Sequence, residues 1–390
     1  MRLPQHDFQD APIVIVGSGL AGYGLARELR KLDKQARVVM LTADDGGYYY
    51  KPALSNAYAQ NKTADALLIS PARKMAEQLD IDLRPFSRVH AIDRAAHRVE
   101  LADGATLGYA KLVLALGAGQ NRLPLPESDA THVLTVNDLP SYARLRDTLD
   151  GRRSIALCGA GLIGCEFAND LVQAGYRVHV LDIAAAPLAR LAPPAAGEFV
   201  RRRLAALGVH WHLGTGIAGV RQAGPGYEVE AMDGTVLTVD AVLSATGLSP
   251  NVALARAAGL RVGRGVVVDR GLATSDPDIL AIGDCAEIEG LLLPYVLPIL
   301  HASRAAAARL AGQDATLCYP AMPVVLKTPA CPAVLAPPLS GCKGDWQVDE
   351  TAHGLRAVHE NGTALNGFVL MGDALEEKNA LTGRLPMLLP

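Results

Sequence analysis

Two stretches of the chain repeat one pattern of apolar and polar positions. Each has a short apolar run, a turn with three glycines, and a segment with helical periodicity. The two stretches cover residues 12–33 and 154–174, and each leads to another apolar run, at residues 37–42 and 176–181. The six glycines of the two turns are Gly17, Gly19, Gly22, Gly159, Gly161 and Gly164. Because parallel strands need helical crossovers, the pattern predicts two βαβ units in two doubly wound α/β domains.

The segments after each βαβ unit also resemble one another. Alternating runs with Asp-Gly turns predict hairpins, and continuous apolar runs predict buried strands. The hairpins are expected at residues 84–107 and 216–239, the strands at 111–116, 241–245 and 278–282, and a helix at 298–311.

The pattern changes towards the carboxyl end. Residues 319–338 contain six prolines among apolar residues. Proline cannot donate to a sheet ladder, so these positions are expected at edges or in loops. We interpret residues 321–390 as a separate α+β domain.

Composition narrows the class of protein. With 390 residues, the chain is long enough for two or three domains. The formal net charge of −3 offers no basic surplus, which argues against nucleic acid as a partner.

The polar residues 1–10 do not resemble a signal peptide, and no apolar run is long enough to span a membrane. The expected location is the cytoplasm.

The six cysteines, at positions 158, 165, 285, 318, 331 and 342, include no C-x-x-C pair. Their spacing fits neither a disulfide framework nor a metal site. Cys165 and Cys285 lie inside the glycine-rich segments and are interpreted as small buried thiols.

The glycine turns indicate dinucleotide binding. The first glycine of G-x-G-x-x-G makes a tight turn, and the second lets the backbone approach a pyrophosphate. The helix that follows offers free N–H groups and the positive end of its dipole. One such motif is weak support, but two in one chain, each between a strand and a helix, predict two dinucleotide sites.

The residue at the end of the second strand of each βαβ unit distinguishes the two predicted dinucleotide sites. In the second unit it is Asp182, whose carboxylate would accept hydrogen bonds from ribose hydroxyls and repel a 2′-phosphate, which favours NADH over NADPH. In the first unit the position is Thr42, with Asp44 and Asp45 slightly beyond.

A third segment, residues 274–286, reads Thr-Ser-Asp-Pro-Asp-Ile-Leu-Ala-Ile-Gly-Asp-Cys-Ala. Together with Ala245-Thr-Gly247 and Pro250-Asn251, it resembles the pyridine-nucleotide disulfide reductase superfamily. That resemblance implies a glutathione-reductase-like architecture. It places FAD on residues 1–115 and 245–320, NADH on 116–244, and the C-terminal domain at 321–390.

The chain departs from the thiol-dependent members of that superfamily. Residues 43–61 hold no cysteine, so a redox-active disulfide or sulfenic acid is not expected there. Electrons would then leave directly from the flavin. A flavin takes two electrons as a hydride and can release them singly, which suits a one-electron protein acceptor.

Further motifs resemble the ferredoxin- and rubredoxin-reductase branches. The segment at residues 48–55 resembles both branches, while 43–46, 161–168, 284–287 and 326–332 resemble the rubredoxin reductases. This resemblance implies rubredoxin as the acceptor and assigns the flavin contacts. They fall on Ser18, Leu20, Ala21, Thr42, Ala43, Val89, Gly283, Asp284, Val296 and Lys327.

The same resemblance places Lys51 and Glu166 near the flavin N5 as the catalytic pair. Lysine would stabilise the negative charge that develops on reduced flavin, and glutamate would orient the lysine. His301 is interpreted as a surface residue at a helix end, and Trp211 and Trp346 as packing residues.

The leading hypothesis is an NADH-dependent flavoprotein that reduces rubredoxin, acting as a monomer. A local basic patch with Arg304, Lys327 or Lys343 would attract the acidic partner. Three alternatives remain open: a reductase of a [2Fe–2S] ferredoxin, an oxidase that passes electrons to O2, and a non-catalytic sensor that binds FAD and NADH.

Overall fold

β1 (Ile13–Val16) lies at the centre of a five-stranded sheet in the computed structural model, which describes residues 11–390. The polar segment 1–10 lies outside the described residues. All four strand pairs of this sheet are parallel. The strand order is β21-β9-β1-β2-β5. The other strands are β21 (Ile279–Ala281), β9 (Lys111–Leu114), β2 (Val38–Leu41) and β5 (Asp82–Arg84).

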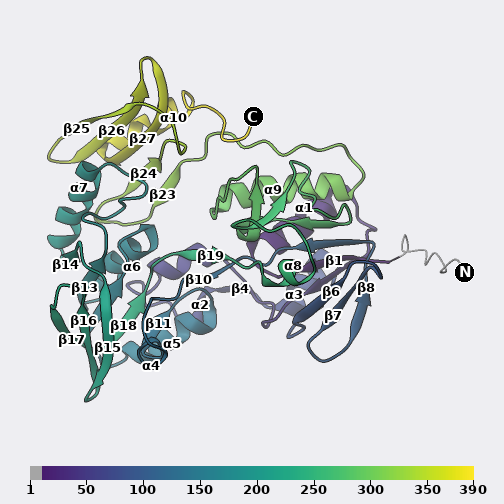
Figure 1. Cartoon of the computed structure of the whole chain (residues 1–390), viewed down its shortest axis with the longest axis horizontal. Coiled ribbons are helices and arrows are strands. Elements are labelled where there is room, and N and C mark those ends of the chain that lie inside the picture. The colour runs from purple at the N-terminus through teal and green to yellow at the C-terminus, as the bar shows by residue number, and fades with distance from the viewer. Residues whose placement is uncertain (1–10) are drawn as a thin grey trace, which may run out of the picture.

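Helices cover this first sheet (Figure 1). α1 (Leu20–Leu32) packs on α9 (Val296–Leu310), and the two approach closely because Gly24 has no side chain: a Cβ there would lie 2.9 Å from Ser303 Oγ. α3 (Ala72–Leu79) packs against α1. The remaining elements of this first unit are β3 (Tyr48–Tyr49), the 3-10 helix η2 (Lys51–Asn56), α2 (Ala64–Leu67), β4 (Leu68–Ser70), α8 (Ala253–Ala257), β20 (Val266–Val268), η3 (Gly283–Cys285) and β22 (Ala286–Ile288).

A second five-stranded parallel sheet repeats the architecture. Its strands, in the order β11-β18-β12-β13-β14, are Val133–Thr135, Ala241–Ser244, Ser154–Cys158, Arg177–Asp182 and His210–Leu213. Its helices are α4 (Glu127–Ala130), α5 (Leu139–Leu149), α6 (Leu162–Gln173) and α7 (Pro194–Ala205). Both βαβ units are therefore confirmed, and with them the doubly wound fold.

The predicted hairpins are present beside each parallel sheet. In the first unit they form the antiparallel strands β6 (Val89–Asp93), β7 (Arg98–Leu101) and β8 (Thr106–Gly108). In the second they form β15 (Ile217–Ala223), β16 (Gly226–Ala231) and β17 (Val236–Val239). The chain crosses between the two units twice, through β10 (Ala118–Gln120) and β19 (Leu248–Pro250), which pair antiparallel.

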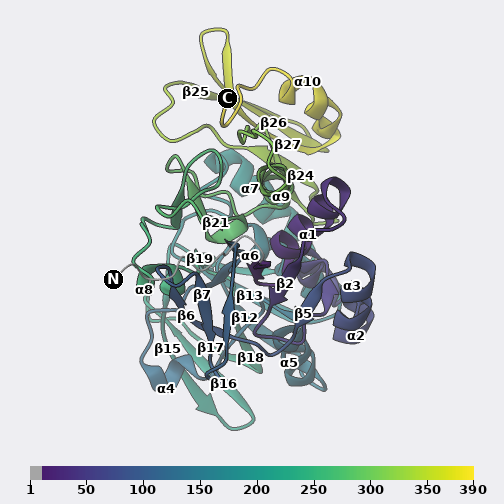
Figure 2. The same ribbon diagram turned by 90° about the vertical axis from the view of Figure 1, so that its right-hand side faces the viewer.

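The C-terminal unit is an antiparallel sheet with short helices. Its strands, in the order β23-β24-β27-β26-β25, are Val324–Leu326, Ala333–Ala336, Ala364–Gly372, Gly354–Asn361 and Asp345–Glu350. They are followed by η4 (Asp373–Glu377) and α10 (Lys378–Thr382). All six prolines of 319–338 lie outside the strands, as expected. Leu335 and Met371 share a buried core with Phe199 of the second unit, and Figure 2 shows this unit at one end of the molecule.

The three predicted strands are one or two residues shorter than expected, and the predicted start of the last long helix was wrong. The helix expected at residues 298–311 begins two residues earlier, at Val296. Pro298 therefore lies within the first turn, where its missing N–H would have no acceptor inside the helix in any case. His301 consequently lies within α9 rather than at its start. No helix in the described part of the chain is long and apolar enough to cross a membrane.

Candidate functional site

The first glycine turn is shaped by close backbone approaches. Gly17 has φ +113°, and a Cβ there would lie 2.3 Å from the Ala115 carbonyl oxygen. A Cβ at Gly22 would lie 1.9 Å from the carbonyl oxygen of Gly17. Gly19, by contrast, would place a Cβ in open space, and it precedes α1 without a side-chain cap. The helix N-terminus is thus left open for an anionic group such as a pyrophosphate.

The second turn repeats this geometry. Gly159 has φ +109°, and a Cβ there would meet the Ala245 carbonyl oxygen at 2.6 Å. A Cβ at Gly164 would lie 1.9 Å from the Gly159 oxygen, whereas Gly161 again faces open space and leaves α6 without a side-chain cap. Asp182 lies beside this turn, because its Oδ2 accepts from the Ala160 N–H at 2.5 Å.

An acidic residue also reaches the first turn. Thr42 is buried at the end of β2, and its hydroxyl donates to Asp44 Oδ1 at 2.5 Å. Ser18 Oγ donates to Thr42 Oγ1 at 2.8 Å. Asp44, which the sequence places slightly beyond Thr42, therefore brings a carboxylate to the strand end. Asp44 lies two residues beyond Thr42 in sequence, and its carboxylate reaches the strand end only because the chain turns back after Thr42.

The expected flavin contacts converge on one edge of the first sheet. The segments that follow β1, β2 and β21 all start at the carboxyl ends of parallel strands, which meet at the same edge. They carry Ser18 to Ala21, Thr42 with Ala43, and Asp284. Val89 begins β6, close to Ser87, whose N–H donates to the Thr42 carbonyl at 2.7 Å, and Val296 begins α9.

Asp284 has the properties expected of a ligand-binding carboxylate. It lies on η3, where a Cβ at Gly283 would come 2.8 Å from Ala21 Cβ, so the loop packs tightly on the start of α1. Its Oδ1 is buried and has no hydrogen-bond partner among residues 11–390. Burial raises the pKa of Asp284, and the charge of Lys51 opposes that rise. An acceptor left unsatisfied in this way fits a ligand with hydroxyl groups, such as the ribityl chain of FAD.

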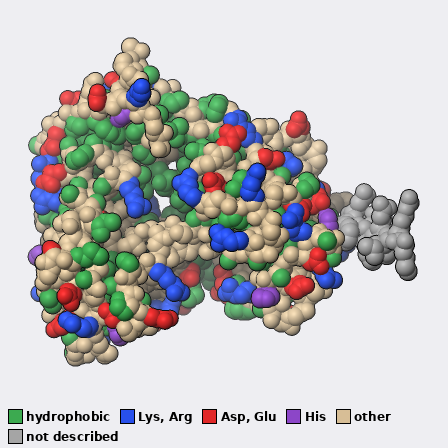
Figure 3. Space-filling view, in the orientation of Figure 1, with side chains coloured by type: hydrophobic (Ala, Val, Ile, Leu, Met, Phe, Trp, Pro, Cys, Tyr) green, Lys and Arg blue, Asp and Glu red, His purple; other side chains and the backbone are tan. Residues whose placement is uncertain are grey.

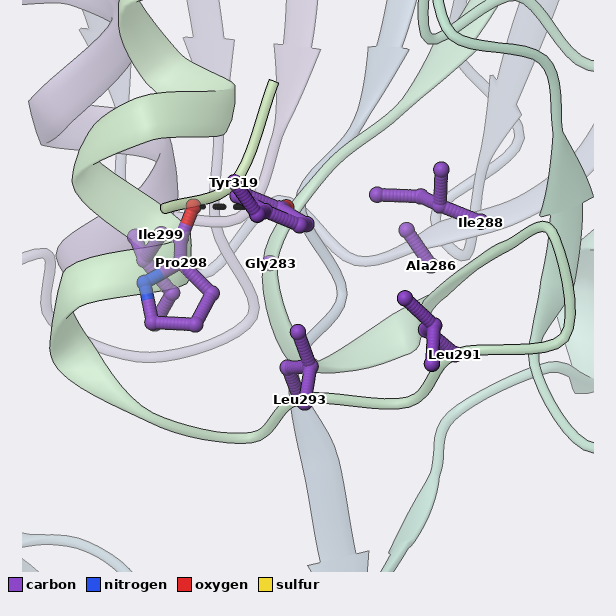
Figure 4. Close-up of a pocket in the computed structure, with 8 residues that line it drawn as sticks. All are labelled: Gly283, Ala286, Ile288, Leu291, Leu293, Pro298, Ile299 and Tyr319. Atoms are coloured by element: carbon purple, nitrogen blue, oxygen red, sulfur yellow. Dashed lines mark hydrogen bonds between the residues drawn. The ribbon is translucent and has the colours of Figure 1, made fainter. Parts of the chain in front are cut away.

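A small cavity lies beside η3 (Figure 4). Gly283, Ile288 and Pro298 line it, together with Tyr319, whose hydroxyl donates to the Pro298 carbonyl at 3.5 Å. Its lining is mostly apolar, and Gly283 is the one residue among residues 11–390 that both lines it and is expected to contact the flavin.

The expected ion pair between Lys51 and Glu166 is not formed. Glu166, on α6, is 1% exposed, and its Oε2 lies 3.1 Å from the ammonium of Lys327. Its Oε1 accepts from the Lys327 main-chain N–H at 3.0 Å. Ser55 Oγ and Asn56 Nδ2 also donate to Oε2. Glu166 therefore joins all three units of the chain, and its cationic partner comes from the C-terminal unit.

Lys51 has a neutral partner instead. Its ammonium donates to Asn137 Oδ1 at 3.2 Å. Burial lowers the pKa of Lys51, and the nearby carboxylates of Asp284, Asp138 and Asp44 oppose that shift in this order of strength. Sequence reasoning missed Asn137, since nothing in its local pattern marks it as a neighbour of a lysine 86 residues away.

The thiols do not form a relay. All six cysteines are free, and four of them are buried. Burial raises the pKa of Cys285 to about 11 and that of Cys165 even further, so both are protonated at neutral pH. A protonated, buried thiol is a poor nucleophile for disulfide exchange. The interpretation of Cys165 and Cys285 as small buried thiols agrees with this geometry.

The chain is similar in sequence to known proteins. Residues 11–312 match the family described as pyridine nucleotide-disulphide oxidoreductase, and residues 316–385 match the rubredoxin binding C-terminal domain. The rubredoxin-NAD(+) reductase of Alcanivorax borkumensis is 45% identical over 97% of this chain and 100% of its own. That of Acinetobacter baylyi is 41% identical over 97% of this chain and 99% of its own.

Solved structures agree with these sequence matches. A ferredoxin reductase from Rhodopseudomonas palustris superimposes with a TM-score of 0.88 at 27% identity, covering 97% of this chain and 96% of that chain. The two glycine turns lie in this fold, together with Asp284, whose Oδ1 has no hydrogen-bond partner in the described part of the chain, and with the buried thiols of Cys165 and Cys285. The chain therefore belongs to the pyridine nucleotide-disulphide oxidoreductase family, and within it to the group of the rubredoxin-NAD(+) reductases.

Proposed function

We propose that this chain is an NADH-dependent flavoprotein that passes electrons from NADH through FAD to rubredoxin. The observation that carries the proposal is the meeting of three units at Glu166. The third unit there matches the rubredoxin-binding domain family, and its Lys327 donates to the carbonyl of Pro52, next to Lys51. An electron acceptor held by the third unit would thus be close to the residues expected around the flavin.

The three units have separate roles in this proposal. Residues 1–115 and 245–320 bind FAD, residues 116–244 bind NADH, and residues 321–390 contact rubredoxin. The FAD contacts are Gly17, Ser18, Gly19, Leu20, Ala21, Gly22, Thr42, Ala43, Lys51, Val89, Gly283, Asp284, Val296 and Lys327. The open N-terminus of α1 would receive the pyrophosphate, and the free oxygen of Asp284 would accept hydrogen bonds from ribityl hydroxyls.

The second unit would bind NADH through Gly159, Gly161, Gly164 and Asp182. The Asp182 carboxylate would repel the 2′-phosphate of NADPH. Residues 183–186 are Ile, Ala, Ala and Ala, so no cation follows that could accept this phosphate. Steady-state rates with the two nucleotides test this, and equal use of NADPH would contradict it.

FAD, when bound, would supply the step that the protein cannot: it accepts a hydride from NADH and releases electrons one at a time. The chain's own residues set the conditions for that chemistry. Lys51 brings a partly buried positive charge close to Asp284, and Glu166 holds the ammonium of Lys327 at the same junction. Positive charge placed in a buried site before the reaction stabilises negative charge that develops during it.

Rubredoxin would approach the side where these units meet. In Figure 3 a hollow separates the lobes of the molecule, and Lys and Arg side chains stand at its rim. Arg304 is available for an acidic partner, since its side chain is 63% exposed and only loosely paired with Glu28 at 3.9 Å. Lys343 is also exposed. Lys327 is engaged by Glu166, so it would contribute charge rather than a free side chain. We further propose that the protein acts as a monomer in the cytoplasm.

Three parallel reactions test the proposal. The FAD-loaded protein is mixed anaerobically with NADH and with oxidised rubredoxin, a [2Fe–2S] ferredoxin, or buffer alone, and the bleaching of each chromophore is followed. We expect rapid reduction of rubredoxin and little reduction of ferredoxin. Preference for ferredoxin would instead support the alternative of a [2Fe–2S] ferredoxin reductase. Bleaching of the flavin without reduction of either carrier would favour the sensor hypothesis.

A further inference from the structure

Asn137 occupies a position that connects two units at Lys51. It lies between β11 and α5 of the second unit, whereas Lys51 begins η2 of the first. The Lys51 ammonium donates to Asn137 Oδ1 at 3.2 Å, across 86 residues of sequence. The contact therefore depends on how the two nucleotide-binding units dock on each other.

The Asn137 side chain is fixed in one orientation. Its Nδ2 donates to the Ala118 carbonyl at 2.9 Å, and its main-chain N–H donates to Ser141 Oγ at 3.0 Å. Only the NH₂ end of an amide can donate to a carbonyl, so the oxygen end must face Lys51. Asn137 thus presents an acceptor to the lysine, with its amide held by the Ala118 carbonyl and its main chain by the Ser141 hydroxyl.

The lysine has no closer anionic partner. Within residues 11–390, no carboxylate lies within 4.0 Å of the Lys51 ammonium, and Glu166 is paired with Lys327 instead. A carboxylate in contact with the ammonium would cancel much of its charge. An amide oxygen can orient the ammonium and leave its positive charge in place.

We propose that Asn137 is a positioning residue for electron transfer: it holds the Lys51 ammonium beside the flavin site with a neutral contact that preserves the lysine's charge. This inference rests on the proposed function, because it requires Lys51 to stabilise negative charge on reduced flavin. It assigns to Asn137 the orienting role that the sequence suggested for Glu166.

A double-mutant cycle on the FAD-loaded protein tests the inference. The measured quantity is the rate at which NADH bleaches the flavin, so rubredoxin is not needed. Asn137→Ala should slow this step about tenfold, the range for losing a hydrogen bond to a charged group. In a Lys51→Met background the same change should have no further effect, because Asn137 acts through Lys51. An equal slowing in both backgrounds would overturn the proposal, as would an unchanged rate in Asn137→Ala.

A charged variant gives a second readout that a merely structural role would not move. Asn137→Asp places a carboxylate against Lys51, so the midpoint potential of the flavin should become more negative. This value is obtained by chemical titration without NADH. It therefore tests Asn137 even if NADH fails to reduce the wild-type flavin, a result that would count against the proposed function instead. An unchanged potential in Asn137→Asp would contradict the inference.

The chain offers a matched control at the same junction. Asn61 Oδ1 accepts from Arg146 Nη2 of α5 at 2.7 Å, which is also an amide–cation contact between the first and second units. Asn61 has φ +52°, so Asn61→Gly removes the amide and keeps the backbone conformation. This variant should keep both the wild-type rate and the wild-type potential. If it slowed flavin reduction as much as Asn137→Ala, the Asn137 effect would be attributed to unit docking and the proposal would fail.

Discussion

Glu166 and Lys327 are joined twice, although 161 residues separate them in sequence. The Lys327 main-chain N–H donates to Glu166 Oε1 at 3.0 Å, and the Lys327 ammonium lies 3.1 Å from Oε2. Since Glu166 is on α6 and Lys327 follows β23, the pair fastens the C-terminal unit to the second unit.

Replacing Glu166 by Ala should therefore destabilise the protein. The change removes acceptors for Ser55 and for the Lys327 main-chain N–H in a buried place, which should lower the free energy of unfolding by about 2 kcal/mol. Denaturant unfolding measures the difference. Glu77→Ala is the control, because Glu77 forms an exposed pair with Arg73 that contributes little. Equal losses in the two variants would show that the Glu166 contacts add nothing.

Asp284→Ala should leave the stability of the apoprotein unharmed but weaken the binding of FAD. Without FAD, Asp284 Oδ1 is a buried acceptor with no partner within residues 11–390, so its removal should leave the apoprotein at least as stable as wild type. With FAD, the variant loses its hydrogen bonds to the ligand, and FAD affinity should fall about tenfold or more. Thermal unfolding of the apoprotein and a titration with FAD provide the two values. Unchanged FAD affinity would remove Asp284 from the proposed flavin site.

Gly161 and Gly164 of the second glycine turn should respond differently to substitution. In the described part of the chain, no atom lies within 4 Å of a Cβ at Gly161, so Gly161→Ala should keep the thermal stability of the fold. The new methyl group should obstruct the pyrophosphate and weaken NADH binding. Gly164→Ala would place Cβ 1.9 Å from the Gly159 oxygen and should destabilise the fold itself. Thermal melts and NADH titrations distinguish the two outcomes. Wild-type NADH affinity in Gly161→Ala would contradict the placement of the pyrophosphate.

A group of histidines predicts a pH dependence of stability. His179 stacks on His210 at 4.9 Å, and its Nδ1 lies 3.2 Å from His212 Nε2. Burial, then these two histidines and Arg177, lower the pKa of His179 to about 4 from an ordinary value of 6.5. Because the unfolded chain binds this proton more readily, the free energy of unfolding should fall as the pH decreases from about 6.5 to about 4.

His179→Gln tests that dependence. Urea unfolding at several pH values in this window should show a smaller slope of stability against pH than in wild type. His353, which is exposed, provides the comparison, and His353→Gln should keep the wild-type slope. If the slope of His179→Gln matched that of wild type, the buried histidine would not be the source.

Short sequence patterns were sufficient to predict the elements whose structure depends on only a few consecutive residues. The glycine turns, the strands that flank them and the Asp-Gly hairpins are each set by a few consecutive residues, and the structure contains all of them. The start of α9 was predicted too late, at Pro298, because proline is as compatible with the first turn of a helix as with the loop before it.

The partners of Lys51 and Glu166 could not be obtained in this way. Which cation reaches Glu166 depends on how the C-terminal unit docks on α6, and no spacing within the sequence specifies that contact. Asn137 reaches Lys51 only because the second unit docks on the first. Asp44 was named beyond Thr42 but assigned no contact, because its carboxylate reaches the strand end only through the turn after Thr42.

The central claim is that electrons from NADH leave the flavin singly for rubredoxin. An anaerobic titration of the FAD-loaded protein and an excess of oxidised rubredoxin with known amounts of NADH measures this directly. Because NADH carries two electrons and the iron of rubredoxin accepts one, about two rubredoxins should be reduced for each NADH oxidised. NADH oxidation without loss of the rubredoxin chromophore would contradict the account.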